Sequence, residues 1–103
     1  MFDHSDVRSN FPILSRQVNG KPLVYLDNGA SAQKPQVVID AISTAYSHEY
    51  ANVHRGLHYL SNLATDKYEN VRSIIARFLG VADERQIIMN SGTTEGKIGR
   101  AHV

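Results

Sequence analysis

The segment from Asn90 to Glu95 has the composition of a phosphate-binding turn. Gly92 allows a ligand to approach the backbone closely, and the hydroxyls of Thr93 and Thr94 can donate hydrogen bonds to phosphate oxygens. If a helix begins here, its free N–H groups and the positive end of its dipole favour an anion. The same residues are also common in helix caps, so this segment alone leaves both interpretations open.

A polar loop at residues 51–58 is a second candidate, because His54 and Arg55 could meet an anionic ligand there. A solvated connection between two helices explains these residues equally well. His54 and His58 are four residues apart, but Gly56 disfavours a regular helix between them and no third ligand has a suitable spacing. We therefore expect no metal site.

The segment 25–32 combines an apolar run with a turn of small residues, and Gly29 and Ala30 leave room for a ligand beside the backbone. An ordinary turn is the alternative. No residue is assigned a catalytic role, because the chain has no Ser-His-Asp order and no paired carboxylates. Three lysines lie in polar surroundings that do not activate an amine, namely Lys21, Lys34 and Lys67.

The composition excludes several classes of function. With 11 Lys and Arg against 10 Asp and Glu among 103 residues, the net charge of +1 argues against nucleic acid or an anionic membrane as a partner. The chain has no Cys, so these residues provide no disulfide, thiolate metal site or cysteine nucleophile. It also has no long apolar run and no signal-peptide pattern, so we expect a cytoplasmic protein.

Two amphipathic helices must position these candidate groups. Apolar residues recur at steps of three and four from Pro35 to about Tyr50, which predicts the first helix. A second such stripe predicts a helix with Ser61 as its N-cap and Gly80 as the residue that ends it. Both helices direct one apolar face toward a core.

Shorter elements surround these helices. We expect a small helix over residues 5–10 capped by Ser5, and short strands at 23–26 and 86–90. The first strand ends in a tight turn in which Asn28 and Gly29 tolerate positive φ. The fold class is therefore α/β. Two helices and two strands make a poor closed domain, so we interpret residues 1–96 as an N-terminal fragment of a larger domain.

Residues 97–103 are expected to be foreign to the native protein. Apolar periodicity is weak after Gly96, and the back-translated codons AAG ATC GGA AGA GCA CAC GTC reproduce the start of a widely used sequencing-library adapter. Without Lys97 and Arg100 the 11 basic residues become 9, against 10 acidic ones, and the net charge becomes −1.

Four segments, in this order and spacing, resemble the N-terminal region of the SufS-type (group II) cysteine desulfurases. These are class V aminotransferase-like, fold-type I enzymes that use pyridoxal 5′-phosphate (PLP). The resemblance covers residues 5–96, and the family commonly has alanine at the position of Gly29. The segments are FPIL (11–14), YLDNGASAQKP (25–35), NVHRGLH (52–58) and SGTTEG (91–96).

The resemblance implies a role for each candidate. Gly92, Thr93 and Thr94 would hold the phosphate of PLP. Gly29 and Ala30 would lie near the path of the substrate. The loop with His54 and Arg55 would reach an active site formed across a homodimer interface.

In this family the substrate is L-cysteine, which becomes L-alanine while its sulfur passes to an enzyme cysteine as a persulfide. The sulfur then goes to an acceptor protein of iron–sulfur cluster assembly. The Schiff-base lysine and the catalytic cysteine have no counterpart in this chain, so the chain alone is expected to be inactive.

Two alternatives remain open at this stage. The first is another class V PLP enzyme, such as a selenocysteine lyase, a kynureninase or an amino-acid epimerase, since these share the phosphate-binding loop. The second is a short α/β module that binds a phosphorylated ligand without catalysis. Such a module would have to fold by itself, which makes the extent of its core the decisive feature.

Overall fold

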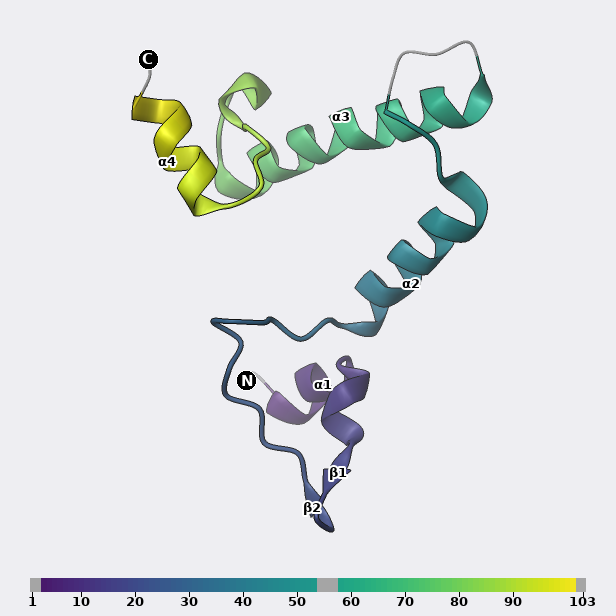
Figure 1. Ribbon diagram of the computed structural model, residues 1–103, viewed down its shortest axis with the longest axis vertical. Helices are drawn as coiled ribbons and strands as arrows, with labels where there is room; N and C mark the ends of the chain where they lie inside the picture. The colour runs from purple at the N-terminus through teal and green to yellow at the C-terminus, as the bar shows by residue number, and fades with distance from the viewer. Residues whose placement is uncertain (1–2, 54–57, 102–103) are drawn as a thin grey trace. The chain divides into compact units, whose positions relative to one another are not determined.

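The computed structural model describes residues 3–53 and 58–101, with side chains through residue 98. The chain forms two compact units, Met1–Tyr50 and Ala51–Val103. Figure 1 shows the elements of each unit in chain order. The first unit contains helix α1 (His4–Ser9), the 3-10 helix η1 (Pro12–Ser15), strands β1 (Gln17–Val18) and β2 (Lys21–Pro22), helix α2 (Gln36–Thr44) and the π-helix η2 (Ala45–Glu49).

Helix α1 confirms the short N-terminal helix but corrects its cap. The cap is Asp3, whose Oδ1 accepts a hydrogen bond from the Ser5 backbone N–H at 2.8 Å. Asp and Ser are about equally good N-caps, so composition does not choose between them. The backbone decides, because Asp3 is extended (φ −95°, ψ 111°) while Ser5 already lies within the helix.

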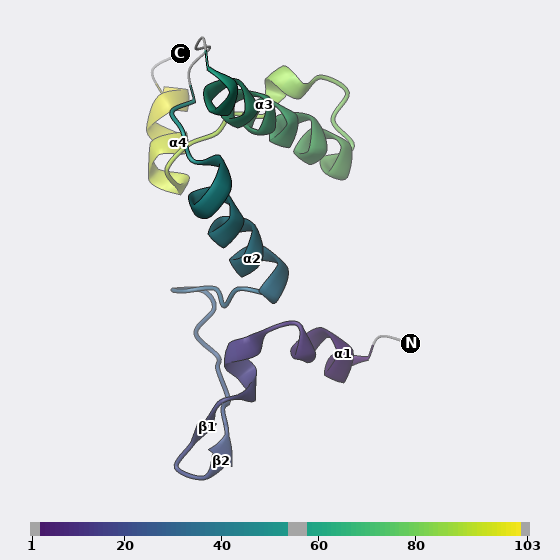
Figure 2. The ribbon, with the colours of Figure 1, turned by 90° about the vertical axis from the view of Figure 1, so that its right-hand side faces the viewer.

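A two-residue hairpin joins β1 and β2, which are antiparallel, with Gln17 opposite Pro22 and Val18 opposite Lys21. Asn19 (φ 52°) and Gly20 (φ 73°) form the turn between them, and Figure 2 shows the hairpin from the side. Two consecutive residues with positive φ are typical of the type I′ turn, whose twist suits a β-hairpin. The Asn-Gly sequence favours this turn. Asn28 and Gly29, which would tolerate positive φ, do not adopt it.

The two predicted strands, 23–26 and 86–90, are not paired with any other described segment. Leu23 and Tyr25 are half-buried whereas Val24 and Leu26 are exposed, and Ile87 to Asn90 show the same alternation. This alternation is that of a strand, but a ladder also needs a neighbouring strand. The Leu23 N–H does donate to the Arg16 carbonyl at 3.0 Å, beside the hairpin, but this single bond does not extend the ladder of β1 and β2.

Helix α2 confirms the predicted helix after Pro35, and its last turn widens into the π-helix η2. Ser47 Oγ donates to the Ser43 carbonyl at 2.7 Å and contacts His48 Nδ1 at 2.6 Å. A serine hydroxyl that bonds a carbonyl one turn back competes with the helical ladder, which accounts for a change of helical pitch at this point. The large apolar residues of α2 and Tyr46 of η2 are exposed, and those of α2 are Val37, Val38, Ile39 and Ile42.

The second unit contains helix α3 (Tyr59–Leu79), the 3-10 helix η3 (Glu84–Gln86) and helix α4 (Thr93–Ala101). Helix α3 confirms the second amphipathic helix, but its N-cap is His58 and not Ser61. Gly80 (φ 69°) ends it as predicted: its N–H donates to the Arg77 carbonyl, and the Val81 N–H donates to the Ala76 carbonyl at 2.8 Å. These two bonds form a Schellman motif. Helix α4 continues through residues 97–101 despite their weak apolar periodicity.

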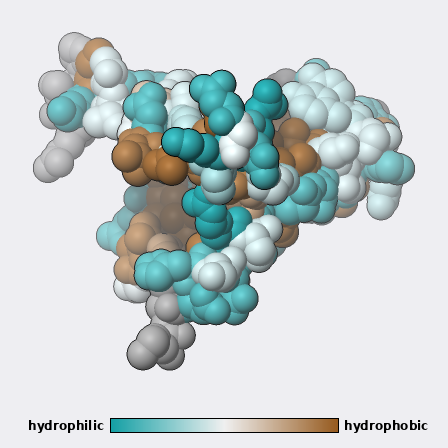
Figure 3. Space-filling view, turned by 90° about the horizontal axis from the view of Figure 1, so that it is seen from below, coloured by the Kyte–Doolittle hydropathy of each residue, from teal (hydrophilic) through white to brown (hydrophobic). Residues whose placement is uncertain are grey.

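Very little of the described chain is buried. Only Ala76 (5% exposed) and Ser61 (2% exposed) are buried among the described residues, and Phe78 of α3 is 87% exposed. Figure 3 shows hydrophobic side chains at the surface on the face it presents. No helix in the described ranges has the length and apolar character needed to cross a lipid bilayer.

The left-handed conformation of Gly80 gives a first prediction. Gly80→Ala should weaken the end of α3 by about 1 kcal/mol, because an L-residue is strained at this φ although space is open around the added Cβ. Hydrogen exchange of the Val81 amide should accelerate about fivefold. Gly29→Ala is the matched control, since its surroundings are also open and its φ is not positive. Equal effects of the two substitutions would contradict this explanation.

Candidate functional site

The first candidate site is the turn that begins α4. Gly92 has φ 143°, a conformation that favours glycine, and its N–H donates to Asn90 Oδ1 at 3.0 Å. The first helical bond of α4 runs from the Gly96 N–H to the Gly92 carbonyl at 3.1 Å. An ideal Cβ on Gly96 would lie 3.0 Å from the Asn90 amide nitrogen, so the absence of a side chain there lets Asn90 approach the turn.

Glu95 caps the same turn from inside the helix. Its carboxylate accepts a hydrogen bond from the Ser91 backbone N–H at 2.6 Å. This backbone bond is the main reason that the pKa of Glu95 lies below its ordinary value, since the bond favours the ionised carboxylate, and a side-chain bond with Ser91 adds to it. The arrangement resembles a capping box, in which a glutamate near the helix start reaches back to an N–H before the helix.

The helix start still offers donors for a ligand. In the described part of the chain, no protein group accepts a hydrogen bond from the backbone N–H groups of Thr93 and Thr94. Their hydroxyls lie on the same exposed turn. An open concavity covers it, lined by Ser91, Gly92, Thr93, Thr94, Glu95 and Ile98. The predicted cofactor residues Gly92, Thr93 and Thr94 therefore share one turn with the donor chemistry that an anion requires.

The second candidate is the turn that holds Gly29 and Ala30. The N–H groups of Ala30 and Ser31 both donate to the Asp27 carbonyl at 3.1 Å, and the Tyr25 hydroxyl donates to the Ser31 carbonyl at 2.7 Å. The Asn28 side chain closes the turn by accepting from the Gln33 N–H. This hydrogen-bonded turn is therefore held by its own residues, and it leaves open space where a Cβ would stand on Gly29.

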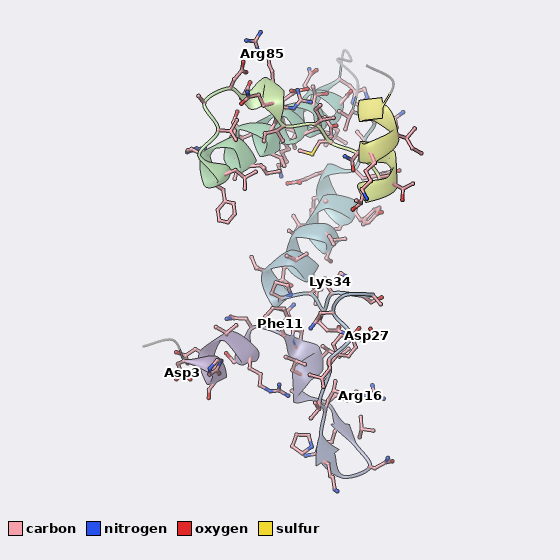
Figure 4. The ribbon with its side chains drawn as sticks, turned by 90° about the vertical axis from the view of Figure 1, so that its left-hand side faces the viewer. Asp3, Phe11, Arg16, Asp27, Lys34 and Arg85 are labelled. Atoms are coloured by element: carbon pink, nitrogen blue, oxygen red, sulfur yellow. The ribbon has the colours of Figure 1, made fainter. Side chains whose placement is uncertain are left out.

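Lys34 belongs to the same segment and donates from Nζ to the Ala32 carbonyl at 2.7 Å. Figure 4 shows Lys34 and Asp27 on the loop that leads to α2. Lys34 is exposed and bonds a neighbouring backbone carbonyl, so its environment is polar.

The third candidate, His54 and Arg55, lies outside the described residues, but both flanks of its loop are described. Ser61 Oγ donates to the Asn52 carbonyl at 3.1 Å, and the Ser61 N–H donates to His58 Nδ1 at 3.3 Å. Sequence reasoning missed this arrangement because it assigned Ser61 as the N-cap. The donor is the Ser61 backbone N–H and His is not among the preferred N-cap residues, so the sequence carried no signal for this cap.

Polar groups elsewhere in the second unit have a structural role. Arg85 bonds Asp83 with its guanidinium at 2.7 Å and with its backbone N–H at 2.9 Å, which lowers the pKa of the Asp83 carboxyl. Figure 4 shows Arg85 at the surface, where such a pair contributes little to stability. Among the described residues, no group of three or more His, Cys, Asp or Glu side chains could hold a metal ion.

Comparison with known proteins adds a family to this geometry. A family model described as aminotransferase class-V matches residues 24–100. The chain belongs to the class V aminotransferase family. The match includes both the turn with Gly29 and Ala30 and the turn with Gly92 to Thr94, and it confirms the expected α/β class.

Individual relatives of this aminotransferase-family chain carry a more specific name. It is 53% identical over 95 residues to "Probable cysteine desulfurase 1" of Mycobacterium leprae (strain TN), an alignment that covers 92% of this chain and 16% of that protein. It is 54% identical over 95 residues to "Cysteine desulfurase" of Salmonella newport (strain SL254), again over 92% of this chain and over 23% of that protein.

A solved structure gives the same result. The apo structure of cysteine desulfurase from Thermococcus onnurineus NA1 matches with a TM-score of 0.64 and 40% sequence identity, over 79% of this chain and 19% of that one. The chain thus spans less than a quarter of the length of these relatives.

The capping bond of Glu95 gives a second prediction. Because the folded carboxyl has a lowered pKa, the bond stabilises the start of α4 above the unfolded pKa of Glu95 and is lost as the pH falls through the folded pKa. The Ser91 amide proton resonance should therefore titrate with a midpoint below the ordinary glutamate pKa. In Glu95→Gln this titration should disappear, whereas in Glu69→Gln, on exposed α3, it should persist. A Ser91 resonance that does not move with pH would contradict the bond.

Proposed function

We propose that this chain is part of a PLP-dependent cysteine desulfurase of the SufS type. The proposed enzyme converts L-cysteine to L-alanine and passes the sulfur, as a persulfide, toward iron–sulfur cluster assembly. The single observation that carries the proposal is the turn Gly92–Thr94, which combines positive φ, free N–H groups and two hydroxyls at a helix start. The names of the relatives support the choice of reaction.

The donor set of this turn fits the phosphate of PLP. A phosphate dianion needs several N–H or O–H donors, and the backbone N–H groups and hydroxyls of Thr93 and Thr94 supply them on one exposed face. The positive end of the α4 dipole adds to the attraction. The carboxylate of Glu95 lies on the Ser91 side of the turn, where it accepts a hydrogen bond and leaves the threonine donors available.

Each part of this chain then has a defined task. Thr93 and Thr94 hold the phosphate, and the small residues Gly29 and Ala30 leave space for the substrate beside the backbone. The resemblance assigns His54 and Arg55 to the side of the substrate. When bound, PLP supplies an electron sink that weakens bonds at the α-carbon of the substrate amino acid.

Other parts of the proposal concern the whole enzyme. It is a cytoplasmic homodimer whose active site includes residues of both subunits, and it delivers sulfur to an acceptor protein. The 103-residue chain contains no Cys to carry a persulfide, so it has no desulfurase activity by itself. The resemblance of the four sequence segments supports these points.

The test of this function uses the full-length protein that contains the chain. We expect it to bind PLP and to form alanine and sulfide from L-cysteine faster than free PLP does. Each of Thr93→Ala and Thr94→Ala should weaken PLP binding about tenfold or more, because a hydrogen bond to a charged group contributes roughly 1.5–3 kcal/mol.

The matched control is Thr44→Ala, which removes an exposed threonine hydroxyl from α2. It should leave the dissociation constant of PLP unchanged. Equal PLP affinity in all three variants would contradict the phosphate site. A protein that binds PLP but releases alanine only from selenocysteine, or that acts on kynurenine, would replace the desulfurase by another class V enzyme.

The non-catalytic phosphate-binding module is tested with the 103-residue chain alone. Because Ala76 and Ser61 are the only buried residues in the described ranges, we expect no sharp thermal unfolding transition by circular dichroism. Millimolar phosphate should then leave the melting curve unchanged. A cooperative transition whose Tm rises with phosphate would favour the module, since a ligand that binds only the native state stabilises it.

A further inference from the structure

The segment 23–36, which contains the turn of small residues described above, is joined at both ends to the N-terminal helix. The guanidinium of Arg8, in α1, donates from Nη2 to the Leu23 carbonyl at 2.8 Å. The Gln36 N–H, at the start of α2, donates to the carbonyl of Asn10, the C-cap of α1, also at 2.8 Å. Both ends of the segment are held by the same end of one helix, so its remaining conformational freedom lies inside it.

The Tyr25 hydroxyl spans the turn inside this segment. It donates to the Ser31 carbonyl at 2.7 Å and lies 3.3 Å from the Asp27 carbonyl. A phenolic hydroxyl has a single proton, so the shorter contact, six residues along the chain, is the main bond. Asp27 lies at the entrance of the turn and Ser31 at its exit. One side chain therefore connects the strand-like residues before the turn to its far end.

The backbone bonds of the turn restrain it less than this side chain does. The N–H groups of Ala30 and Ser31 share one acceptor, the Asp27 carbonyl, at 3.1 Å each. Gly29 lies between donor and acceptor, and glycine can adopt more backbone conformations than any other residue. A turn closed in this way would sample several shapes by itself. The Tyr25 hydroxyl limits that sampling because it fixes the Ser31 carbonyl.

The Asn28 side chain adds a second restraint to the same turn. Its Oδ1 accepts a hydrogen bond from the Gln33 N–H at 3.0 Å. An ideal Cβ on Gly29 would meet no described atom within 4 Å, so neither restraint occupies the space beside the small residues. The two side chains therefore shape the turn and leave this space open.

We propose that Tyr25, assisted by Asn28, is a positioning residue for the turn that carries Gly29 and Ala30. Its hydroxyl holds the turn in the shape that leaves room for the substrate amino acid beside the backbone. A turn that opens part of the time lowers the apparent affinity for the substrate by the fraction of molecules that keep this shape. The part that concerns the substrate rests on the proposed function. The restraint of the turn by Tyr25 does not depend on it.

The first experiment measures the turn without using activity, by hydrogen exchange of the full-length protein. The Ala30 and Ser31 amides are hydrogen-bonded to the Asp27 carbonyl, so their exchange requires the turn to open. Tyr25→Phe removes the hydroxyl and keeps the ring. We expect exchange in a peptide that covers residues 27–34 to accelerate about fivefold.

Tyr46→Phe is the matched control, since it removes an exposed tyrosine hydroxyl from η2 in the same unit. Exchange in residues 27–34 should not change in this variant. Equal exchange rates in Tyr25→Phe and Tyr46→Phe would overturn the proposal. If Tyr25→Phe fails to fold, Asn28→Ala removes the second restraint at an exposed position, and an unchanged exchange rate in the same peptide would overturn the proposal as well.

The second experiment measures kinetics in the PLP-loaded protein. Tyr25→Phe should raise KM for L-cysteine about threefold or more and change kcat less than twofold. The affinity for PLP should stay the same, because the hydroxyl bonds carbonyls of the turn at 27–31 and not the phosphate turn at Gly92. Faster exchange with an unchanged KM would overturn the substrate part of the proposal. A protein without desulfurase activity would contradict the proposed function, while the exchange rates would still decide the role of Tyr25.

Discussion

The first turn of a helix leaves backbone N–H groups without helical acceptors, and the way each helix of the second unit satisfies them determines what its start can do. At α3 the acceptor is the His58 side chain, which bonds the Ser61 N–H. At α4 the Glu95 carboxylate and the Asn90 amide accept from the two residues before the helix. The first helical N–H groups of α4, at Thr93 and Thr94, remain available.

This difference separates the two helix starts. At the start of α3, Ser61 is buried and its hydroxyl bonds the Asn52 carbonyl, which joins the helix to the preceding chain at that point. The start of α4 is exposed, carries two hydroxyls beside its N–H groups and requires positive φ at Gly92. The same dipole and the same kind of backbone donors are present at both helices, and the side chains around them decide which one can receive an anion.

Few of the described residues are buried. Helices α2 and α3 each expose apolar side chains along one face, and Ala76 and Ser61 alone are buried within the described ranges. The cysteine desulfurases to which the chain is similar are more than four times as long as the matched region. In a domain of that size, amphipathic faces such as these normally pack against a sheet.

The sequence by itself determined the features that depend on neighbouring residues. The spacing of apolar residues was enough for α2 and α3, and Gly80 was enough for the end of α3, because helical bonds join residues only a turn apart. The helix start after Gly92 was also predictable, since Gly92, Thr93 and Thr94 are consecutive.

Only the tertiary structure decided the features that depend on distant partners. Residues 23–26 and 86–90 alternate as strands do, yet a strand is defined by a ladder with another segment, and no described segment supplies one. Asn-Gly occurs twice, and the hairpin formed at Asn19 rather than Asn28 because strands flank only the first. The contact between Ser61 and Asn52 spans nine residues, so backbone geometry, and not composition, determined that this serine connects a loop instead of capping a helix.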